Sequence, residues 1–262
     1  MVVHPFFLYK YKPLPQRLLN EQDYKQLDYV LEILEDHKLY IPLRDELNDP
    51  MESSAVYVSL GIPGYGWAKE CGMLHPTLKD TLDSFRILSL TDSPFITPMW
   101  ANYANNSHGV CIMFQTYSVL SDVQPVVYTS HPFSVSEMNF PVGRRNFFHD
   151  AVRDSLLFKE KSWSYEEEWR LIAPSTQKYL DVSDNVIRGV ILGSCISDEI
   201  SEKLIKVCNK EKISCYRAFT LPGIGKIEIY PAEIKIDDLF YKTKSERCAL
   251  WGPDRCSPFL ER

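Results

Sequence analysis

The sequence predicts an α+β fold, a single domain with a mixed, mostly antiparallel sheet flanked by helices. Short segments rich in β-branched and aromatic residues outnumber the segments with helical periodicity. The two kinds of segment do not alternate along the chain, which disfavours a doubly wound parallel sheet. No internal repeat or interdomain linker is visible. We therefore expect one globular domain over residues 1–240, followed by a loose C-terminal tail over residues 241–262.

The first half of the chain contains the clearest single elements. Residues 6–11 (FFLYKY) predict a first strand, because aromatic residues favour β structure. Residues 18–37 predict a helix, since leucine and valine recur there at helical spacing and Asn20 is a candidate cap. Residues 48–50 (NDP) predict a turn, and residues 61–72 predict a glycine-rich flexible loop. Residues 99–107 predict a short helix or turn.

The remaining elements follow from apolar runs bounded by polar residues. Further strands are predicted at residues 39–42, 85–90, 109–114, 123–128, 168–172 and 186–192. Further helices are predicted at residues 147–158 and 197–209. Residues 213–220 and 227–234 predict a hairpin around the turn sequence LPGIGK.

Composition narrows the classes of function. The 262 residues are 45% hydrophobic and 24% charged, as in an ordinary globular protein, and the net charge of −6 argues against a broad nucleic-acid-binding surface. Seven cysteines without C-x-x-C spacing indicate free thiols in a reducing compartment, and six scattered histidines disfavour a zinc site. No apolar run suits a signal peptide or a membrane span. We expect a cytoplasmic protein with no metal and no membrane partner.

The segment WSYEEEWRLI at residues 163–172 holds three consecutive carboxylates flanked by aromatic residues. If this segment is helical, Ser164 and Glu167 form a capping box, and Glu166 pairs with Arg170 at i,i+4. A charged triplet of this kind usually marks a solvated helix face. A purely structural role therefore stays open.

An extended conformation gives the same segment a different meaning. Glu166, Glu168 and Arg170 would then share one face, with Tyr165 and the other aromatic and apolar side chains opposite. We expect a capped turn that leads into a strand at about Trp169. A polar face backed by aromatics can present an acid to a cleft. A partly desolvated carboxylate beside arginine could orient a ribose hydroxyl or stabilise a developing cation.

A second candidate region is MWANYANNSHGVCIMF at residues 99–114. Trp100 and Tyr103, together with Asn102 and Asn105, suit a planar ligand such as a nucleobase or nicotinamide. The alternative is a helix that packs the two aromatic side chains inward while the asparagines form turns. We expect His108 to be a surface or packing residue rather than a catalytic base.

Taken in order, the motifs LYKY, LNDPME, LSL, MWANYANNSHGVCIMF, KSWSYEEEWRLI and VIRGVILG resemble a bacterial domain-of-unknown-function family, number 2971. The resemblance spans roughly residues 6–235. Its most specific motif is W-x-Y-E-x-E-W/Y-R, which is matched here by Trp163, Tyr165, Glu166, Glu168, Trp169 and Arg170. Two histidines of the family pattern are replaced here by Asn102 and Ser107, so the resemblance carries no histidine role to this chain.

More distantly, the pattern resembles ADP-ribosyltransferases. These enzymes place Arg or His on a first strand, Ser or Tyr on a second, and Glu, often within E-x-E, at the start of a later strand. The resemblance implies a similar fold and NAD as the substrate. The matching positions are Lys10 with Tyr9 or Tyr11, then Ser89, then Glu166 and Glu168. The chain departs from the pattern at the first strand, which contains no Arg or His; His4 lies just ahead of it.

Roles follow from this second resemblance. Glu168 would be the catalytic carboxylate that bonds the nicotinamide ribose and stabilises an oxocarbenium-like transition state, with Glu166 as its partner in activating the target. Tyr11, Trp100 and Tyr103 would shape the pocket for nicotinamide and ribose. The full set of expected NAD-binding residues is Tyr9, Lys10, Tyr11, Ser89, Trp100, Tyr103 and Arg170.

The function we expect is an NAD-consuming ADP-ribosyltransferase-like toxin or defence effector that modifies a macromolecule, a protein or nucleic acid. An antitoxin or other regulatory partner would restrain it. On this hypothesis Glu168→Gln abolishes activity without lowering the melting temperature. The alternative is a non-catalytic sensor module that binds a nucleotide or partner in a bacterial defence or regulatory system. A third option is a metal-dependent phosphodiester hydrolase.

Overall fold

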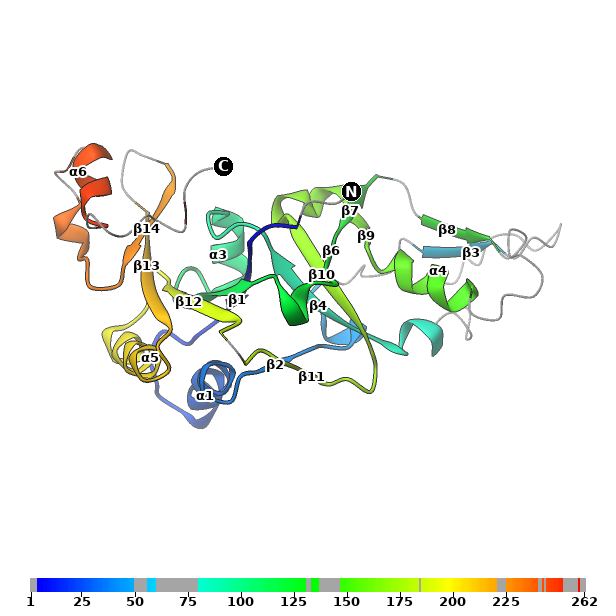
Figure 1. Ribbon diagram of the computed structural model, residues 1–262, viewed down its shortest axis with the longest axis horizontal. Helices are drawn as coiled ribbons and strands as arrows, with labels where there is room; N and C mark the ends of the chain where they lie inside the picture. Colours follow the sequence, from blue (N-terminus) through cyan, green and yellow to red (C-terminus); the bar gives the residue numbers. More distant parts are fainter. Residues whose placement is uncertain are drawn as a thin grey trace. The chain divides into compact units, whose positions relative to one another are not determined.

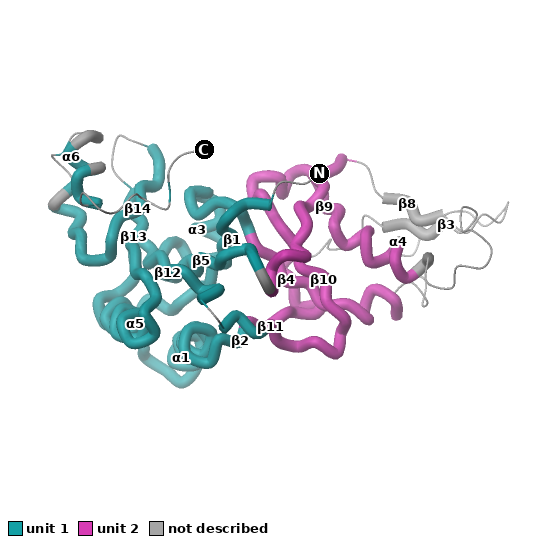
Figure 2. The backbone as a smooth tube through the Cα atoms, viewed as in Figure 1, with its two compact units in different colours: residues 1–38, 91–117, 181–262 teal, residues 39–90, 118–180 magenta. Residues whose placement is uncertain are grey.

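The structure is a computed structural model (Figure 1). It describes residues 4–49, 56–59, 80–130, 133–136, 147–183, 185–220, 225–239, 242, 244–251 and 259. The expected α+β class with mixed, mostly antiparallel strand pairing is confirmed. The chain divides into two compact units (Figure 2): unit 1 comprises residues 1–38, 91–117 and 181–262, and unit 2 comprises residues 39–90 and 118–180. The single domain expected over residues 1–240 stays a prediction.

Unit 1 contains five neighbouring strands in the order β14-β13-β12-β5-β1. Their bounds are β1 Phe7–Lys12, β5 Val110–Gln115, β12 Ile187–Leu192, β13 Ser214–Thr220 and β14 Ile227–Pro231. Strands β12 and β13 are parallel, and the other pairs are antiparallel. All six residues of β5 are buried, so both faces of this strand are covered, and β1 and β12 pair with its two edges. The predicted hairpin is confirmed as β13 and β14.

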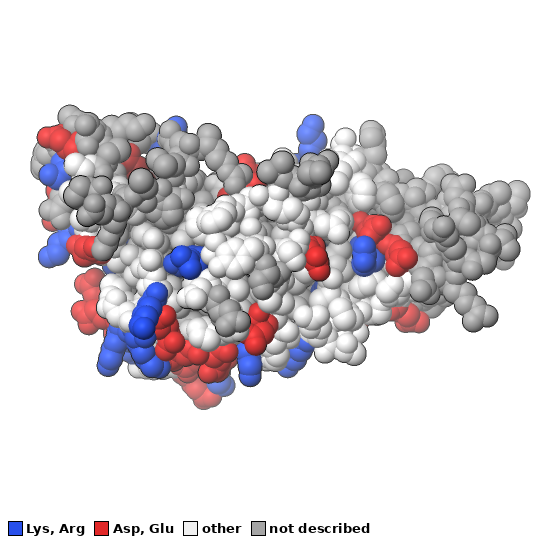
Figure 3. Space-filling model, in the orientation of Figure 1, with Lys and Arg blue, Asp and Glu red and all other residues white. Residues whose placement is uncertain are grey.

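The helices of unit 1 are α1 (Glu21–Glu35), α3 (Thr97–Tyr103), α5 (Asp198–Lys210) and α6 (Lys244–Ala249), with a 3₁₀ turn η6 at Ile236–Asp238. The predicted cap of α1 is confirmed, since the Asn20 side chain accepts from the Asp23 N–H and the Asp23 carboxylate accepts from the Asn20 N–H. Basic and acidic side chains intermix over α1 and α5 (Figure 3), as in the Lys210–Glu35 ion pair of 2.8 Å.

Unit 2 contains three neighbouring strands in the order β4-β10-β6, with bounds Phe85–Thr91, Glu168–Pro174 and Gln124–Pro125. Two parallel pairs accompany them: β3 (Val56–Ser59) with β8 (Phe133–Ser136), and β7 (Val127–Thr129) with β9 (Phe158–Glu160). It also contains helix α4 (Phe147–Ser155) and the 3₁₀ turns η1 (Arg44–Glu46), η3 (Ser118–Leu120) and η5 (Lys161–Glu166). Strand β2 (Lys38–Tyr40) pairs with β11 (Tyr179–Asp181).

Three predicted elements are corrected by the structure. The strand expected at residues 123–128 is divided at Val126, because the Val126 N–H bonds to Glu168 of β10 whereas the Val127 N–H bonds to Leu157, next to β9. The helix expected at residues 147–158 ends at Ser155, since the chain turns there into β9. Helix α6 lies in the stretch that was expected to be a loose tail.

The glycine-rich loop predicted at residues 61–72 lies outside the described residues. Among the described residues, no helix combines the length and the apolar character that crossing a membrane requires.

Candidate functional site: a buried ion cluster at the start of β10

Residues 163–172 form a tight turn that leads into a strand, as predicted. The turn is η5, and β10 begins at Glu168. Between them Glu167 adopts a left-handed conformation with φ 47°, which redirects the chain into the strand. The cap was predicted wrongly. The Glu160 side chain, and not a Ser164–Glu167 box, caps the turn by accepting the N–H of its second residue, Ser162, at 2.9 Å.

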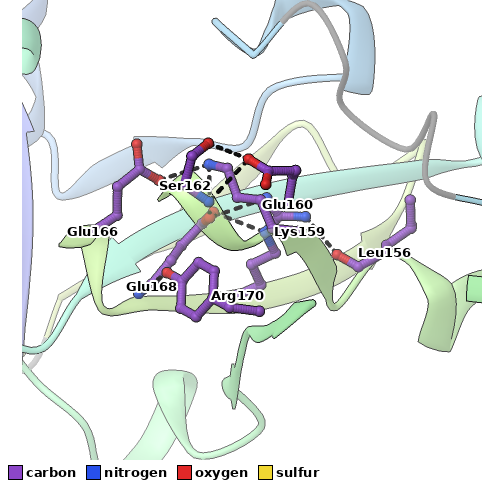
Figure 4. A network of polar contacts seen from close by, with 8 residues as sticks. Leu156, Lys159, Glu160, Ser162, Glu166, Glu168 and Arg170 are labelled. Carbon is purple, nitrogen blue, oxygen red and sulfur yellow. Dashed lines mark hydrogen bonds and ion pairs between the residues drawn. The ribbon is translucent and has the colours of Figure 1, made fainter. Parts of the chain in front are cut away.

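Four charged side chains meet at this point in what we term the buried ion cluster, formed by Lys159, Glu166, Glu168 and Arg170 (Figure 4). The Lys159 Nζ lies 2.6 Å from Glu166 Oε2 and 3.1 Å from Glu168 Oε2. The Arg170 Nε donates to Glu168 Oε1 at 2.8 Å, and its Nη2 donates to Glu168 Oε2 at 3.1 Å. Two positive and two negative charges therefore balance within one small volume.

Local structure explains why these residues meet. Glu168 and Arg170 are two residues apart in β10, so their side chains leave the same face of the strand. Glu166 is the last residue of η5, and Lys159 is the middle residue of β9. Residue exposures are 5% for Lys159, 3% for Glu166, 5% for Glu168 and 1% for Arg170. Charges buried this deeply need partners of opposite sign, and each of them has one.

The cluster holds both of its central groups in their charged forms at neutral pH. Burial alone would raise the pKa of Glu168, but the charges of Arg170 and Lys159, with their hydrogen bonds, outweigh burial and lower that pKa to about 2. Burial would lower the pKa of Lys159, but the charges of Glu168 and Glu166 outweigh it and raise that pKa above its ordinary value. Glu168 is therefore an ionised carboxylate, as a group that stabilises a developing cation has to be.

Two neutral side chains complete the surroundings of Glu168. The Ser89 hydroxyl, from β4, makes a hydrogen bond that contributes to the lowered pKa of the Glu168 carboxylate. The Glu168 N–H donates to the Tyr128 hydroxyl oxygen at 2.8 Å. With one bond from Lys159, two from Arg170 and one from Ser89, the carboxylate has as many donors as a carboxylate has lone-pair positions.

The structure brings four of the predicted site residues together: Ser89, Glu166, Glu168 and Arg170. All three charged members are buried, and the expectation that their polar face lines a cleft stays a prediction. Lys159 was missed by the sequence analysis. A physical signal could have found it: two carboxylates at the start of an apolar strand need a nearby cation when they are buried, and Lys159 precedes them by seven and nine residues.

The other predicted NAD-binding residues belong to unit 1. Tyr9 and Tyr11 of β1 and Trp100 of α3 are buried at 4%, 5% and 2% exposure. The rings of Tyr11 and Trp100 meet edge to face with centroids 5.1 Å apart, and the Trp100 Nε1 donates to the Pro94 carbonyl at 2.8 Å. These three side chains therefore pack in a hydrophobic core, which is the alternative that the sequence left open for Trp100.

Lys10 and Tyr103 are partly buried members of the same unit. Lys10 lies opposite Ile112 in the β1–β5 pair, and Tyr103 ends α3. Unit 1 thus holds Tyr9, Lys10, Tyr11, Trp100 and Tyr103, whereas unit 2 holds the cluster. The predicted NAD-binding residues fall into two groups on separate units.

Residues 99–171 match the model of a family described as "Protein of unknown function (DUF2971)". This stretch contains all four residues of the buried ion cluster and supports the resemblance noted from the motifs, over a shorter range than residues 6–235. No curated protein and no solved structure matches the chain. The family description assigns no activity.

Proposed function

We propose that the protein is an NAD-consuming ADP-ribosyltransferase-like enzyme that modifies a macromolecular target. The observation that carries this proposal is the placement of Ser89 and Glu168 on the neighbouring strands β4 and β10, with Ser89 among the groups that lower the pKa of Glu168. The pattern of these enzymes places a serine on one strand and E-x-E at the start of a later strand. Here Ser89 lies in β4, Glu168 opens the neighbouring strand β10, and Glu166 precedes it by two residues.

The chemistry assigned to Glu168 suits its surroundings. Cleavage of the bond between nicotinamide and ribose develops positive charge on the ribose, and an ionised carboxylate stabilises that charge. Arg170 and Lys159 keep Glu168 ionised and hold it in one orientation. Ser89 is the one uncharged donor among the four bonds to this carboxylate. A ribose hydroxyl would replace the Ser89 hydroxyl at the least electrostatic cost, because the two charged donors would stay in place.

The test is release of nicotinamide from NAD by the purified protein, alone and with cell extract as a source of acceptors. We expect release by the wild type, and a loss of about a hundredfold or more in Glu168→Gln. The matched control is Glu167→Gln, the same change one residue earlier at an exposed side chain, which should leave the rate unchanged. The assay is run at a temperature where circular dichroism shows all variants folded.

The result that contradicts the proposal is equally clear. Wild-type protein that releases no nicotinamide with any extract is not an NAD-consuming transferase. If Glu168→Gln protein stays folded and retains the wild-type rate, Glu168 is not a catalytic residue. As a toxin or defence effector in the cytoplasm, the protein should also arrest the growth of host cells, with relief by Glu168→Gln or by a restraining partner.

A second candidate function is a non-catalytic module that binds a nucleotide or a partner. The observation that favours it is the burial and complete pairing of the Glu168 carboxylate, because a saturated buried ion cluster is well suited to holding a binding surface rigid. Calorimetric binding of NAD without nicotinamide release would support the binding module over the transferase.

A further inference from the structure

Three aromatic side chains surround the start of β10 and are partly exposed, unlike the charged cluster beside them. We call them the aromatic rim: Tyr128 of β7, and Trp163 and Tyr165 of η5. The rings of Trp163 and Tyr165 have centroids 6.2 Å apart and are tilted by 35°. Tyr128 is tied to the same point by the Glu168 N–H, which donates to its hydroxyl oxygen at 2.8 Å.

The buried ion cluster positions this rim. The Lys159 Nζ lies 4.8 Å from the centroid of the Trp163 ring, so the same ammonium group that joins the two carboxylates also supports Trp163. Tyr128, in β7, is paired with the strand that carries Lys159. The rim is therefore built on secondary structure that the cluster holds in place, and its rings are oriented in advance of any binding.

The Tyr128 hydroxyl still has a hydrogen that it can donate. It accepts the Glu168 N–H through its oxygen, and within the described part of the chain no acceptor takes its own hydrogen. Burial is the largest cause that raises the pKa of the Tyr128 hydroxyl, and the charges of Glu168 and Glu166 raise it further. The Glu168 N–H and the charge of Arg170 lower this pKa in part. A half-buried phenol that stays protonated is thus available to donate to a ligand.

We infer that the aromatic rim binds the ribosyl nicotinamide end of a dinucleotide, with the cationic ring against Trp163 and Tyr165 and a hydrogen bond from Tyr128. This inference rests on the proposed function and replaces the pocket that the sequence placed at Tyr11, Trp100 and Tyr103. The face of an aromatic ring attracts a planar cation more strongly than it attracts a neutral planar ring. The neighbouring ion cluster adds no net charge, because Lys159 and Arg170 balance its two carboxylates.

The test measures affinity by calorimetry for NAD, nicotinamide mononucleotide and AMP. Trp163→Leu should weaken the binding of NAD by about tenfold, which is the usual effect of removing one stacked ring. Trp163→Phe keeps a ring and should restore part of that loss. Tyr128→Phe should weaken binding by about threefold to tenfold through loss of one hydrogen bond. Tyr179→Leu is the matched control, because Tyr179 is a 47% exposed ring of the same unit outside the rim.

Tryptophan fluorescence provides a second readout. Of the tryptophans that the structure describes, Trp100, Trp169 and Trp251 are buried and Trp163 is partly exposed. We therefore expect NAD to quench the fluorescence of the wild type, and the share of the quenching that comes from Trp163 to disappear in Trp163→Leu. Nicotinamide mononucleotide should compete with NAD and AMP should not. Equal competition by AMP, unchanged affinity in Trp163→Leu, or no binding of NAD by the wild type would overturn the inference.

The inference and the proposed function fail in different ways. If NAD binding depends on Trp163 but no nicotinamide is released, the aromatic rim is supported as the binding site and the transferase activity is contradicted. If nicotinamide is released and the KM for NAD is unchanged in Trp163→Leu, the transferase activity is supported and the aromatic rim is contradicted as the binding site.

Discussion

Glu167 and Glu168 are neighbours in the chain with opposite surroundings. Glu167 is exposed in a left-handed conformation at the end of η5, whereas Glu168 opens β10 with 5% exposure and ion pairs to Lys159 and Arg170. The left-handed conformation of Glu167 accounts for this difference, because it redirects the chain so that the next side chain, Glu168, points inward.

The two glutamates should respond differently to the same substitution. Glu168→Gln removes the charge that Lys159 and Arg170 share, and we expect the free energy of unfolding to fall by about 3 kcal/mol. Glu167→Gln should change it by no more than about 0.5 kcal/mol. Urea denaturation followed by circular dichroism measures both. The sequence-based expectation of an unchanged melting temperature in Glu168→Gln is therefore revised, and finding no difference between the variants would contradict the burial of Glu168.

The pH dependence of stability has a defined sign. The pKa of Glu168 is about 2 in the folded protein against an ordinary 4.5, so its stabilisation is complete above about pH 4.5 and is lost as pH falls through 2. The size of this loss is about 3 kcal/mol. Urea midpoints measured from pH 7 to pH 2 should fall less steeply in Glu168→Gln. Parallel curves for the two proteins would contradict the lowered pKa.

At the scale of elements, the turn after α3 has three consecutive residues in the left-handed conformation. Asn105, Asn106 and Ser107 all have positive φ, at 47°, 52° and 65°. The turn is fixed by the Cys195 N–H, which donates to the Ser107 carbonyl at 2.9 Å. A Cβ on Gly193 would lie 2.1 Å from the same Ser107 oxygen. The end of β12 thus approaches the turn so closely that only glycine fits.

Substituting this glycine tests the close approach. Gly193→Ala should lower the free energy of unfolding by about 2–3 kcal/mol, because backbone must move away from the new methyl group. The control is Gly225→Ala, where φ is +66° but nothing lies within 4 Å, and we expect a cost of about 1 kcal/mol. Equal effects of the two substitutions in urea denaturation would show that β12 does not pack against the turn.

At the scale of the whole molecule, residues 244–251 pack against the rest of unit 1. Trp251 follows α6 with 9% exposure, and its ring lies 5.8 Å from that of Tyr216 and 6.4 Å from that of Tyr230. Arg247 of α6 forms an ion pair with Glu228 of β14 at 2.9 Å. The segment therefore covers side chains of β13 and β14.

Trp251 should contribute to the free energy of unfolding only if the C-terminal segment is packed rather than loose. Trp251→Ala should reduce the free energy of unfolding by about 3 kcal/mol, as for other buried tryptophans. Leu19→Ala, at a 78% exposed apolar side chain of the same unit, should have an effect below about 0.5 kcal/mol. Thermal unfolding is the measurement, and a melting temperature unaffected by Trp251→Ala would restore the loose tail.

The sequence by itself determined the elements whose signal is local. The helix capped by Asn20 and the buried strand β5 follow from periodicity and capping over a few residues, and both are found where they were expected. The E-x-E segment was also singled out as a candidate site, because three consecutive carboxylates are flanked there by aromatic residues.

Only the tertiary structure decided what surrounds that segment. Lys159 joins Glu166 and Glu168 because β9 pairs with β7, and Ser89 joins them because β4 and β10 are neighbours, although Ser89 and Glu168 are 79 positions apart in the sequence. Likewise, α6 has a short and irregular apolar pattern, and its place depends on the rings of β13 and β14. Burial and charge pairing are properties of distant contacts, and no pattern over neighbouring residues contains them.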